Sequence, residues 1–134
     1  MSSTAVMMRG LREIDKHINA GMTLDYFIPS RFDEGYGLSE KAIKRLCQEK
    51  QRPDLIITVD CGVTSDNEIK LLNNMGVDVV VTDHHAKSDN YPQNCLLIDP
   101  EANDEGSEDA NLAGVGVALK LICVLCGRLG MPHI

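Results

Sequence analysis

The sequence has 134 residues, and its 13 Lys and Arg against 20 Asp and Glu give a net charge of −7. This acidic total argues against simple electrostatic wrapping around nucleic acid, which needs a basic surface. Aromatic residues make up only 4% of the chain and Trp is absent, so we expect no extended base-stacking surface. The acidity is uneven, because residues 1–52 carry nine basic and seven acidic groups while residues 53–134 carry four and thirteen.

The chain has no run of about 18 to 20 apolar residues, and its first residues do not resemble a secretory signal, so we expect no contact with membranes. Its five cysteines are an odd number spread along the chain, which indicates reduced thiols in a cytoplasmic protein. Cys123 and Cys126 have CxxC spacing, but they lie in an apolar run without a second pair of ligands. We therefore expect both cysteines to lie in a hydrophobic core.

In the first third of the chain, the spacing of apolar residues predicts a helix, a short strand and a second helix. The first helix covers about residues 4–20, and its apolar face carries Met7, Leu11, Ile14 and Ile18. Residues 24–28 are apolar and aromatic and are followed by a proline, which predicts a strand. Ser39 is suited to cap a helix that buries the apolar side chains of residues 42–47.

The middle of the chain carries the pattern of a βαβ unit. Residues 54–59 and 78–82 are continuous runs rich in β-branched residues, which is typical of strands buried on both faces of a parallel sheet. Residues 66–74, between them, have helical spacing. Such a unit crosses over with a right hand. The predicted fold class is therefore α/β, with a Rossmann-like parallel sheet and flanking helices.

Two further elements are predicted in the last third of the chain. Residues 95–98 read as another strand, and residues 112–129 are apolar on almost every side, as in a helix buried within a larger assembly. Between them, residues 99–109 hold six acidic and no basic side chains, which predicts a solvated loop. The spacing of these acids does not match a calcium-binding loop.

Side chains with metal-binding chemistry follow both strands of the βαβ unit. Asp60 comes directly after the first strand, and Asp83, His84 and His85 come directly after the second. Ligands of open parallel sheets bind beyond the carboxyl ends of the strands, and neighbouring strands lie about 4.8 Å apart. We therefore expect these side chains to converge on one divalent ion such as Mn²⁺, Zn²⁺ or Fe²⁺. For a single Asp, the role of turn or cap residue remains an alternative.

Four blocks in this order resemble the DHH phosphoesterase superfamily. Val59–Gly62 reads VDCG, Asp83–His85 reads DHH, and residues 112–118 read LAGVGVA. The block at residues 26–38, YFIPSRFDEGYGL, resembles more narrowly the RecJ family of single-strand-specific exonucleases. The resemblance implies a DHH phosphoesterase N-terminal domain. It implies a two-metal phosphodiesterase, with Mn²⁺ or else Mg²⁺, that degrades single-stranded DNA from its 5′ end in DNA repair and recombination.

The resemblance also implies roles for individual residues. Asp60 and His84 would be metal ligands, and His85 would be a catalytic residue that contacts the scissile phosphate. Asp83 would support catalysis by orienting an imidazole or a backbone amide rather than by binding metal.

Three residues of the resembling blocks would bind substrate. The Arg31 guanidinium would clamp a 5′-phosphate, although a surface ion pair with a neighbouring acid is an equal alternative. Gly114 and Gly116 would form a loop at a helix start where the backbone closely approaches an anion.

The family's first motif, an Asp-x-Asp-Gly turn, and its C-terminal substrate-binding domain have no counterpart in the sequence. We therefore expect residues 1–134 to form a partial DHH catalytic domain that is inactive alone and reaches single-stranded DNA through the larger protein. An unpaired sheet edge would favour self-association. Two other functions stay open: a DHH-type phosphodiesterase for oligonucleotides or cyclic dinucleotides, and a non-catalytic scaffold that binds DNA or a protein partner.

Overall fold

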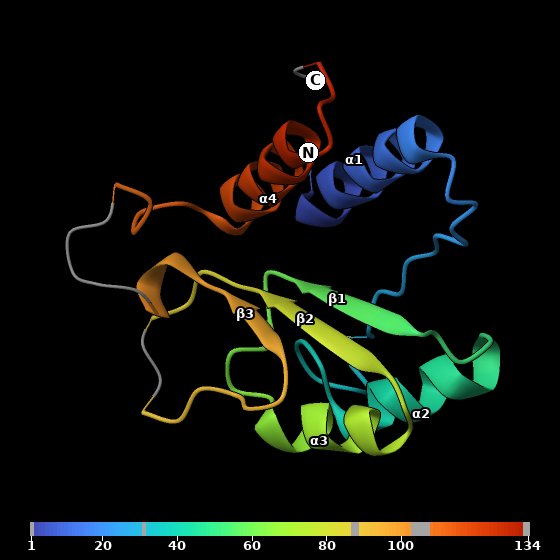
Figure 1. The fold of residues 1–134 in the computed structure, drawn as a ribbon. Helices are drawn as coiled ribbons and strands as arrows, with labels where there is room; N and C mark the ends of the chain where they lie inside the picture. Colours follow the sequence, from blue (N-terminus) through green and yellow to red (C-terminus); the bar gives the residue numbers. More distant parts are fainter. Residues whose placement is uncertain (1, 31, 87–88, 103–107, 133–134) are drawn as a thin grey trace.

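The computed structural model describes residues 2–30, 32–86, 89–102 and 108–132. A parallel sheet lies between two pairs of helices, with α1 and α4 on one face and α2 and α3 on the other (Figure 1). This confirms the predicted α/β fold class. The elements are α1 (Ser3–Ile18), α2 (Glu40–Glu49), β1 (Leu55–Val59), α3 (Asp66–Asn74), β2 (Asp78–Thr82), β3 (Leu96–Ile98), the 3-10 helix η1 (Pro100–Ala102) and α4 (Gly114–Arg128).

The sheet has the strand order β1-β2-β3, and both pairings are parallel. Val59 at the end of β1 is paired with Thr82 at the end of β2, and Thr82 is paired with Ile98 at the end of β3. The three strands therefore end in line. The residues that follow them share one edge of the sheet, and the connection from β1 through α3 to β2 is the predicted βαβ unit.

The face of the sheet that carries α2 and α3 buries a compact apolar cluster. The Ser39 hydroxyl accepts a hydrogen bond from the Ala42 N–H at 3.1 Å, so the predicted cap does begin α2. Val79 and Val81, alternate residues of β2, point toward these helices and exclude water from this side of the sheet. The buried members of this cluster are Ile43, Ile69, Leu72, Val77, Val79 and Val81.

The opposite face carries a second cluster, in which α1 packs against α4. Its buried members are Met7, Ile14, Ala118, Ile122 and Cys126. Ile57 and Val59 of β1 pack against this cluster, so it ties the helix pair to the sheet. The core position expected for Cys126 is confirmed, whereas the expectation for Cys123 is wrong, because that side chain is exposed. Apolar residues surround α4 on most sides, and this pattern alone cannot distinguish the packed face from the open one.

The strand predicted for residues 24–28 is absent, and the structure has irregular backbone there. A strand needs a neighbouring strand for its hydrogen bonds, and this segment has none in the described sheet. Tyr26 and Ile28 are 56% and 66% exposed, so their apolar character does not report burial in a sheet.

The apolar surface of α4 is only partly covered. Leu119 and Val124 are 53% and 50% exposed. Within the described ranges, no helix has both the length and the apolar content that crossing a membrane requires.

The close approach of α1 and α4 depends on Gly10. A β-carbon at this position would lie 2.5 Å from the γ-carbons of Ile122, which is itself buried in the interface. We expect Gly10→Ala to lower the free energy of unfolding by about 1 kcal/mol or more, because overpacking outweighs the gain in helix propensity. Urea denaturation monitored by circular dichroism measures the change.

Gly127→Ala is the matched control for this substitution. A β-carbon at residue 127 meets no atom of the described residues within 4 Å, so the same change in the last turn of α4 should leave stability unchanged or raise it. Equal stability of the two variants would contradict the proposed tight contact.

Candidate metal centre

Backbone hydrogen bonds fix the acids that follow the strands. The Asp60 N–H donates to the Thr82 carbonyl at 2.9 Å, and the Asp83 N–H donates to the Ile98 carbonyl at 3.1 Å. These bonds continue the parallel pairing one step beyond the strands. As a result, Asp60, Asp83 and Asp99 all begin loops at the carboxyl edge of the sheet.

Asp60 has a φ of 65°, in the left-handed region that residues other than glycine rarely adopt. Its carbonyl accepts a hydrogen bond from the Tyr36 hydroxyl at 3.1 Å. The Thr58 hydroxyl donates to the carbonyl of Cys61, the next residue, at 2.7 Å. The turn after β1 is thus held from both sides, and such a maintained conformation is typical of functional positions.

Asp60, His84 and His85 each offer one ligand atom, and these atoms lie within 4.8 Å of one another. His84 Nε2 lies 2.7 Å from Asp60 Oδ1. This contact does not count as a hydrogen bond, and Oδ1 is buried without a hydrogen-bond partner in the described chain. A buried carboxylate oxygen without a donor is costly unless a cation stands beside it. Asp60 Oδ1 and His84 Nε2 are therefore placed as two ligands of one metal ion would be.

A divalent cation fits these atoms. Two ligands about 2.1 Å from an ion and at right angles lie about 3.0 Å apart, which is close to the 2.7 Å between His84 Nε2 and Asp60 Oδ1. A carboxylate with imidazoles suits Mn²⁺, Fe²⁺ or Zn²⁺. The Asp60, His84 and His85 side chains are 37%, 33% and 48% exposed, so the centre lies at the surface of the domain although Asp60 Oδ1 itself is buried.

Asp83 is only 1% exposed, and the protein occupies both of its carboxylate oxygens. Oδ2 accepts a hydrogen bond from the Val63 N–H at 3.1 Å. Oδ1 accepts one from the His84 N–H at 2.8 Å and contacts the ring Nδ1 of His85. Several donors around one buried anion stabilise its charge and fix the backbone that carries the two histidines. The Asp83 carboxylate therefore faces the chain and positions its neighbours.

The hydrogen bond from Asp83 orients the His85 ring. With Nδ1 held by the carboxylate, Nε2 is left for a ligand or substrate on the open side of the ring. The same hydrogen bond raises the pKa of His85, and burial opposes this only in part. The Tyr36 ring stands edge-on to the His85 ring, with 6.5 Å between their centroids. His85 is thus a fixed imidazole that favours the charged form.

Asp99 is a buried member of this edge that the sequence pattern assigned wrongly to a solvated loop. The residue is 2% exposed, because it directly follows β3 and is enclosed where the strands end. Its Oδ1 accepts a hydrogen bond from the Glu101 N–H at 2.8 Å, whereas Oδ2 is buried without a hydrogen-bond partner in the described chain. Its place after a strand, as for Asp60 and Asp83, is the signal that could have identified it.

The three residues expected to bind substrate have different places. Gly114 lies directly against the Asp60 carboxylate. Gly116, two residues along the helix, lies against the Leu112 side chain instead. Arg31 lies outside the described residues.

Cys61 follows Asp60 directly, but it does not join the cluster of ligand atoms. Burial raises the pKa of its thiol to about 11, and the nearby Asp83 carboxylate adds to this effect. The thiol is therefore protonated near neutral pH, and it supplies no thiolate ligand to the centre.

Arg45 of α2 fastens the block at residues 26–38 to the domain. Its guanidinium pairs with Glu34, donates to the Ile28 carbonyl at 3.1 Å and stacks 4.4 Å from the centre of the Phe27 ring. Glu34 also accepts a hydrogen bond from the Ser30 N–H at 2.7 Å. These contacts hold the irregular segment before α2 against that helix, and they thereby help to place Tyr36 beside the turn at Asp60.

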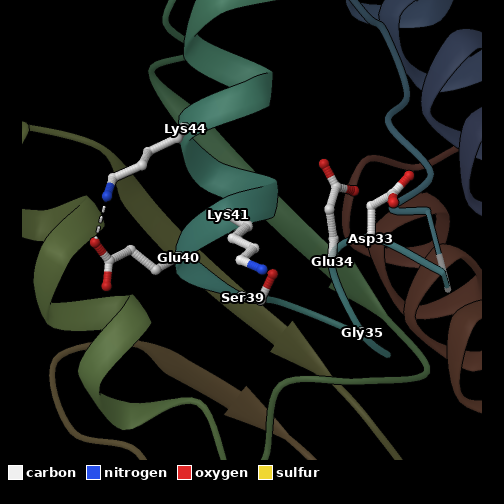
Figure 2. Close-up of a pocket in the computed structure, with 7 residues that line it drawn as sticks. All are labelled: Asp33, Glu34, Gly35, Ser39, Glu40, Lys41 and Lys44. Carbon is white, nitrogen blue, oxygen red and sulfur yellow. Dashed lines mark ion pairs between the residues drawn. The ribbon is translucent and has the colours of Figure 1, made fainter.

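A pocket beside the start of α2 lies apart from the metal-ligating residues. Figure 2 shows its lining side chains, in which Lys44 is paired with Glu40 at 2.7 Å. The lining is Asp33, Glu34, Gly35, Ser39, Glu40, Lys41 and Lys44. Acids outnumber bases among these residues, so the charge of the pocket does not favour a phosphate.

Fold and site together define an α/β domain with a candidate metal centre at the carboxyl edge of a parallel sheet. A profile of the DHH family, N-terminal domain, matches residues 1–132. The chain belongs to the DHH family, which confirms the resemblance seen in the sequence.

The relatives and solved structures most similar to the chain include RecJ proteins. This chain is 37% identical over 130 residues to the single-stranded-DNA-specific exonuclease RecJ of Bacillus subtilis. The match covers 96% of this chain and 15% of that protein. The RecJ of Escherichia coli is 34% identical over 124 residues, covering 92% of this chain and 20% of that protein. The chain thus spans about a fifth or less of these curated relatives.

Two crystal structures of RecJ with manganese share the fold. One, exonuclease RecJ bound to manganese, has a TM-score of 0.79 at 35% identity, covering 98% of this chain and 31% of that one. The other, RecJ of Thermus thermophilus in complex with Mn²⁺, has a TM-score of 0.73 at 32% identity, covering 98% and 17%.

Asp99 gives the domain a pH dependence that can be measured. Burial raises the pKa of Asp99, so the folded chain holds this proton more tightly than the unfolded chain does. The group therefore favours folding at low pH, and this contribution is lost as pH rises through the folded pKa. We expect Asp99→Asn to gain stability relative to the wild type between about pH 4 and pH 8.

Urea denaturation at both pH values measures this gain. Asp78→Asn, which removes an exposed acid from the start of β2, is the control for the change in net charge. A difference between Asp99→Asn and the wild type that stays constant with pH would contradict the assignment.

Proposed function

We propose that this chain contributes part of the active site of a metal-dependent phosphodiesterase that removes nucleotides from the 5′ end of single-stranded DNA. The convergence of Asp60, His84 and His85, with a buried unpartnered oxygen facing a ring nitrogen, carries this proposal. The similarity to RecJ exonucleases supports the substrate, and the manganese-bound RecJ structures support Mn²⁺ as the metal, with Mg²⁺ as the alternative. Such an enzyme would act in DNA repair and recombination.

In this proposal Asp60 and His84 hold the ion. A bound divalent ion would polarise the scissile phosphate and lower the pKa of a water molecule. His85, oriented by Asp83 and favouring its charged form, donates a hydrogen bond to a phosphate oxygen from its open Nε2. Asp83 does not touch the substrate and acts by holding the His84 backbone N–H and the His85 imidazole. Arg31 is proposed to bind the 5′-phosphate.

The two proposed ligands, Asp60 and His84, are fewer than a two-ion centre requires. We therefore expect the remaining ligands and most of the DNA-binding surface to come from other parts of the protein, since the matched relatives are several times longer. The chain alone should bind Mn²⁺ weakly and release no nucleotides. The free edge of β1 would favour self-association of the isolated chain. The five free cysteines fit a reducing, cytoplasmic setting.

Metal binding is tested on the chain itself. We expect calorimetric titration with Mn²⁺ to show binding that Asp60→Asn or His84→Ala weakens about 10-fold or more, since each removes one of few ligands. His17→Ala is the matched control, because this histidine of α1 contacts the Leu129 carbonyl and lies outside the cluster. Binding that is insensitive to Asp60→Asn would favour the non-catalytic scaffold.

The activity is tested on the full-length protein that contains this chain. With Mn²⁺, 5′-labelled single-stranded DNA should lose nucleotides faster than DNA duplexes or cyclic dinucleotides, and Asp83→Asn should slow this at least 10-fold by releasing the His85 ring. A preference for dinucleotides would support the oligonucleotide phosphodiesterase instead. Mn²⁺-dependent turnover by residues 1–134 alone, abolished by His84→Ala, would overturn the expected inactivity of the isolated chain.

A further inference from the structure

The start of α4 closes directly over the Asp60 side chain. Gly114 is the first residue of α4 and is buried. A β-carbon built on Gly114 would lie 2.6 Å from Asp60 Cγ and 3.0 Å from Asp60 Cβ, and it would overlap Oδ1. Real β-carbons do not tolerate such distances, so the Asp60 carboxylate has its position only because residue 114 lacks a side chain.

Asp60 has little freedom to move away from residue 114. Its N–H is bonded to the Thr82 carbonyl, its carbonyl accepts from the Tyr36 hydroxyl, and its φ is already 65°. A bulkier residue at 114 would therefore have to turn the carboxylate itself. Because Oδ1 stands 2.7 Å from His84 Nε2, turning the carboxylate separates two of the ligand atoms.

Movement of α4 does not relieve the contact either. Its first turn is closed by hydrogen bonds from the Gly116 and Val117 N–H groups to the Ala113 carbonyl. Further along, Ala118 and Ile122 are buried against α1. Packing against α1 thus holds the start of α4 in place. A methyl group added at residue 114 would therefore displace the Asp60 side chain rather than the helix.

We infer that Gly114 is a positioning residue of the metal centre, which acts through Asp60 and not through contact with substrate. The inference rests on the proposed function only in that Asp60 is taken to hold the metal. It replaces the substrate-binding role expected for Gly114.

Gly116 supplies a matched control two residues away. A β-carbon there would lie 3.0 Å from Leu112 Cδ2, the far end of a flexible, half-buried side chain that can shift. Both glycines lie in the first turn of α4, so alanine changes helix propensity alike at the two positions. Only the contact with Asp60 distinguishes them.

The experiment compares Gly114→Ala and Gly116→Ala in the whole chain. Mn²⁺ affinity is measured by calorimetry and by electron paramagnetic resonance, and the His84 ring resonances are recorded by NMR without metal. We expect Gly114→Ala to weaken Mn²⁺ binding about 10-fold or more and to shift the His84 signals, as changes around first ligands do. Gly116→Ala should stay within about twofold of the wild type.

Two outcomes separate the inference from the proposed function. Wild-type Mn²⁺ affinity with unshifted His84 signals in Gly114→Ala would overturn the inference and leave the proposed function intact. If even the wild type binds no Mn²⁺ through Asp60, the proposed function fails, and the metal-free His84 signals still decide whether Gly114 positions Asp60.

A second variant covers the case in which Gly114→Ala does not fold. Asp60→Gly removes the carboxylate and suits the left-handed backbone of residue 60. In that background, Gly114→Ala should fold as Asp60→Gly alone does. If Gly114→Ala still prevents folding there, the contact with Asp60 is not the reason for glycine, and the inference is overturned.

Discussion

The parallel pairing of β1 with β2 is the constraint on which the site depends. The two strands end in register, and the Asp60 N–H extends the ladder to the Thr82 carbonyl. This hydrogen bond fixes the position of Asp60, along the strand direction, relative to the DHH block that follows β2. Strand pairing is held in turn by the apolar clusters on both faces, because the helices that exclude water from the sheet also keep its register. The apolar clusters, which lie away from the site, thus determine where the site residues lie at the edge of the sheet.

The carboxylates at this edge differ in whether their oxygens have hydrogen-bond partners in the protein. Asp83 is enclosed and fully bonded to the chain, so it serves the two histidines. Asp60 is held by its backbone, while its Oδ1 has no hydrogen-bond donor among the described residues and is free to bind a cation. The contrast between a satisfied and an unsatisfied carboxylate distinguishes a positioning group from a ligand more clearly than sequence position does.

Much of the fold follows from local pattern, because β-branched runs and helical spacing report burial directly. The βαβ unit and the helices were predictable for this reason. The Ser39 cap was predictable because serine before a helical pattern is a common N-cap. The strand expected at residues 24–28 fails because pairing needs a neighbour, which no local pattern contains. Asp99 was misassigned because its acidic neighbours dominate the composition of residues 99–109, while enclosure by the strand ends decides its burial. The contact of Gly114 with Asp60 joins residues far apart in the chain, and only the folded structure reveals it.

The in-line ends of the strands also determine how the sequence can vary. Asp60 and Asp83 meet through strand pairing, and the Val63 N–H of the connection after β1 also binds the Asp83 carboxylate. That connection is therefore part of the site, whereas the loop between α3 and β2 can lengthen or shorten in related chains. One residue inserted within β1 would turn the following acid to the other face of the sheet. Related sequences should therefore show rigid blocks at the strand ends, separated by gaps of changing length.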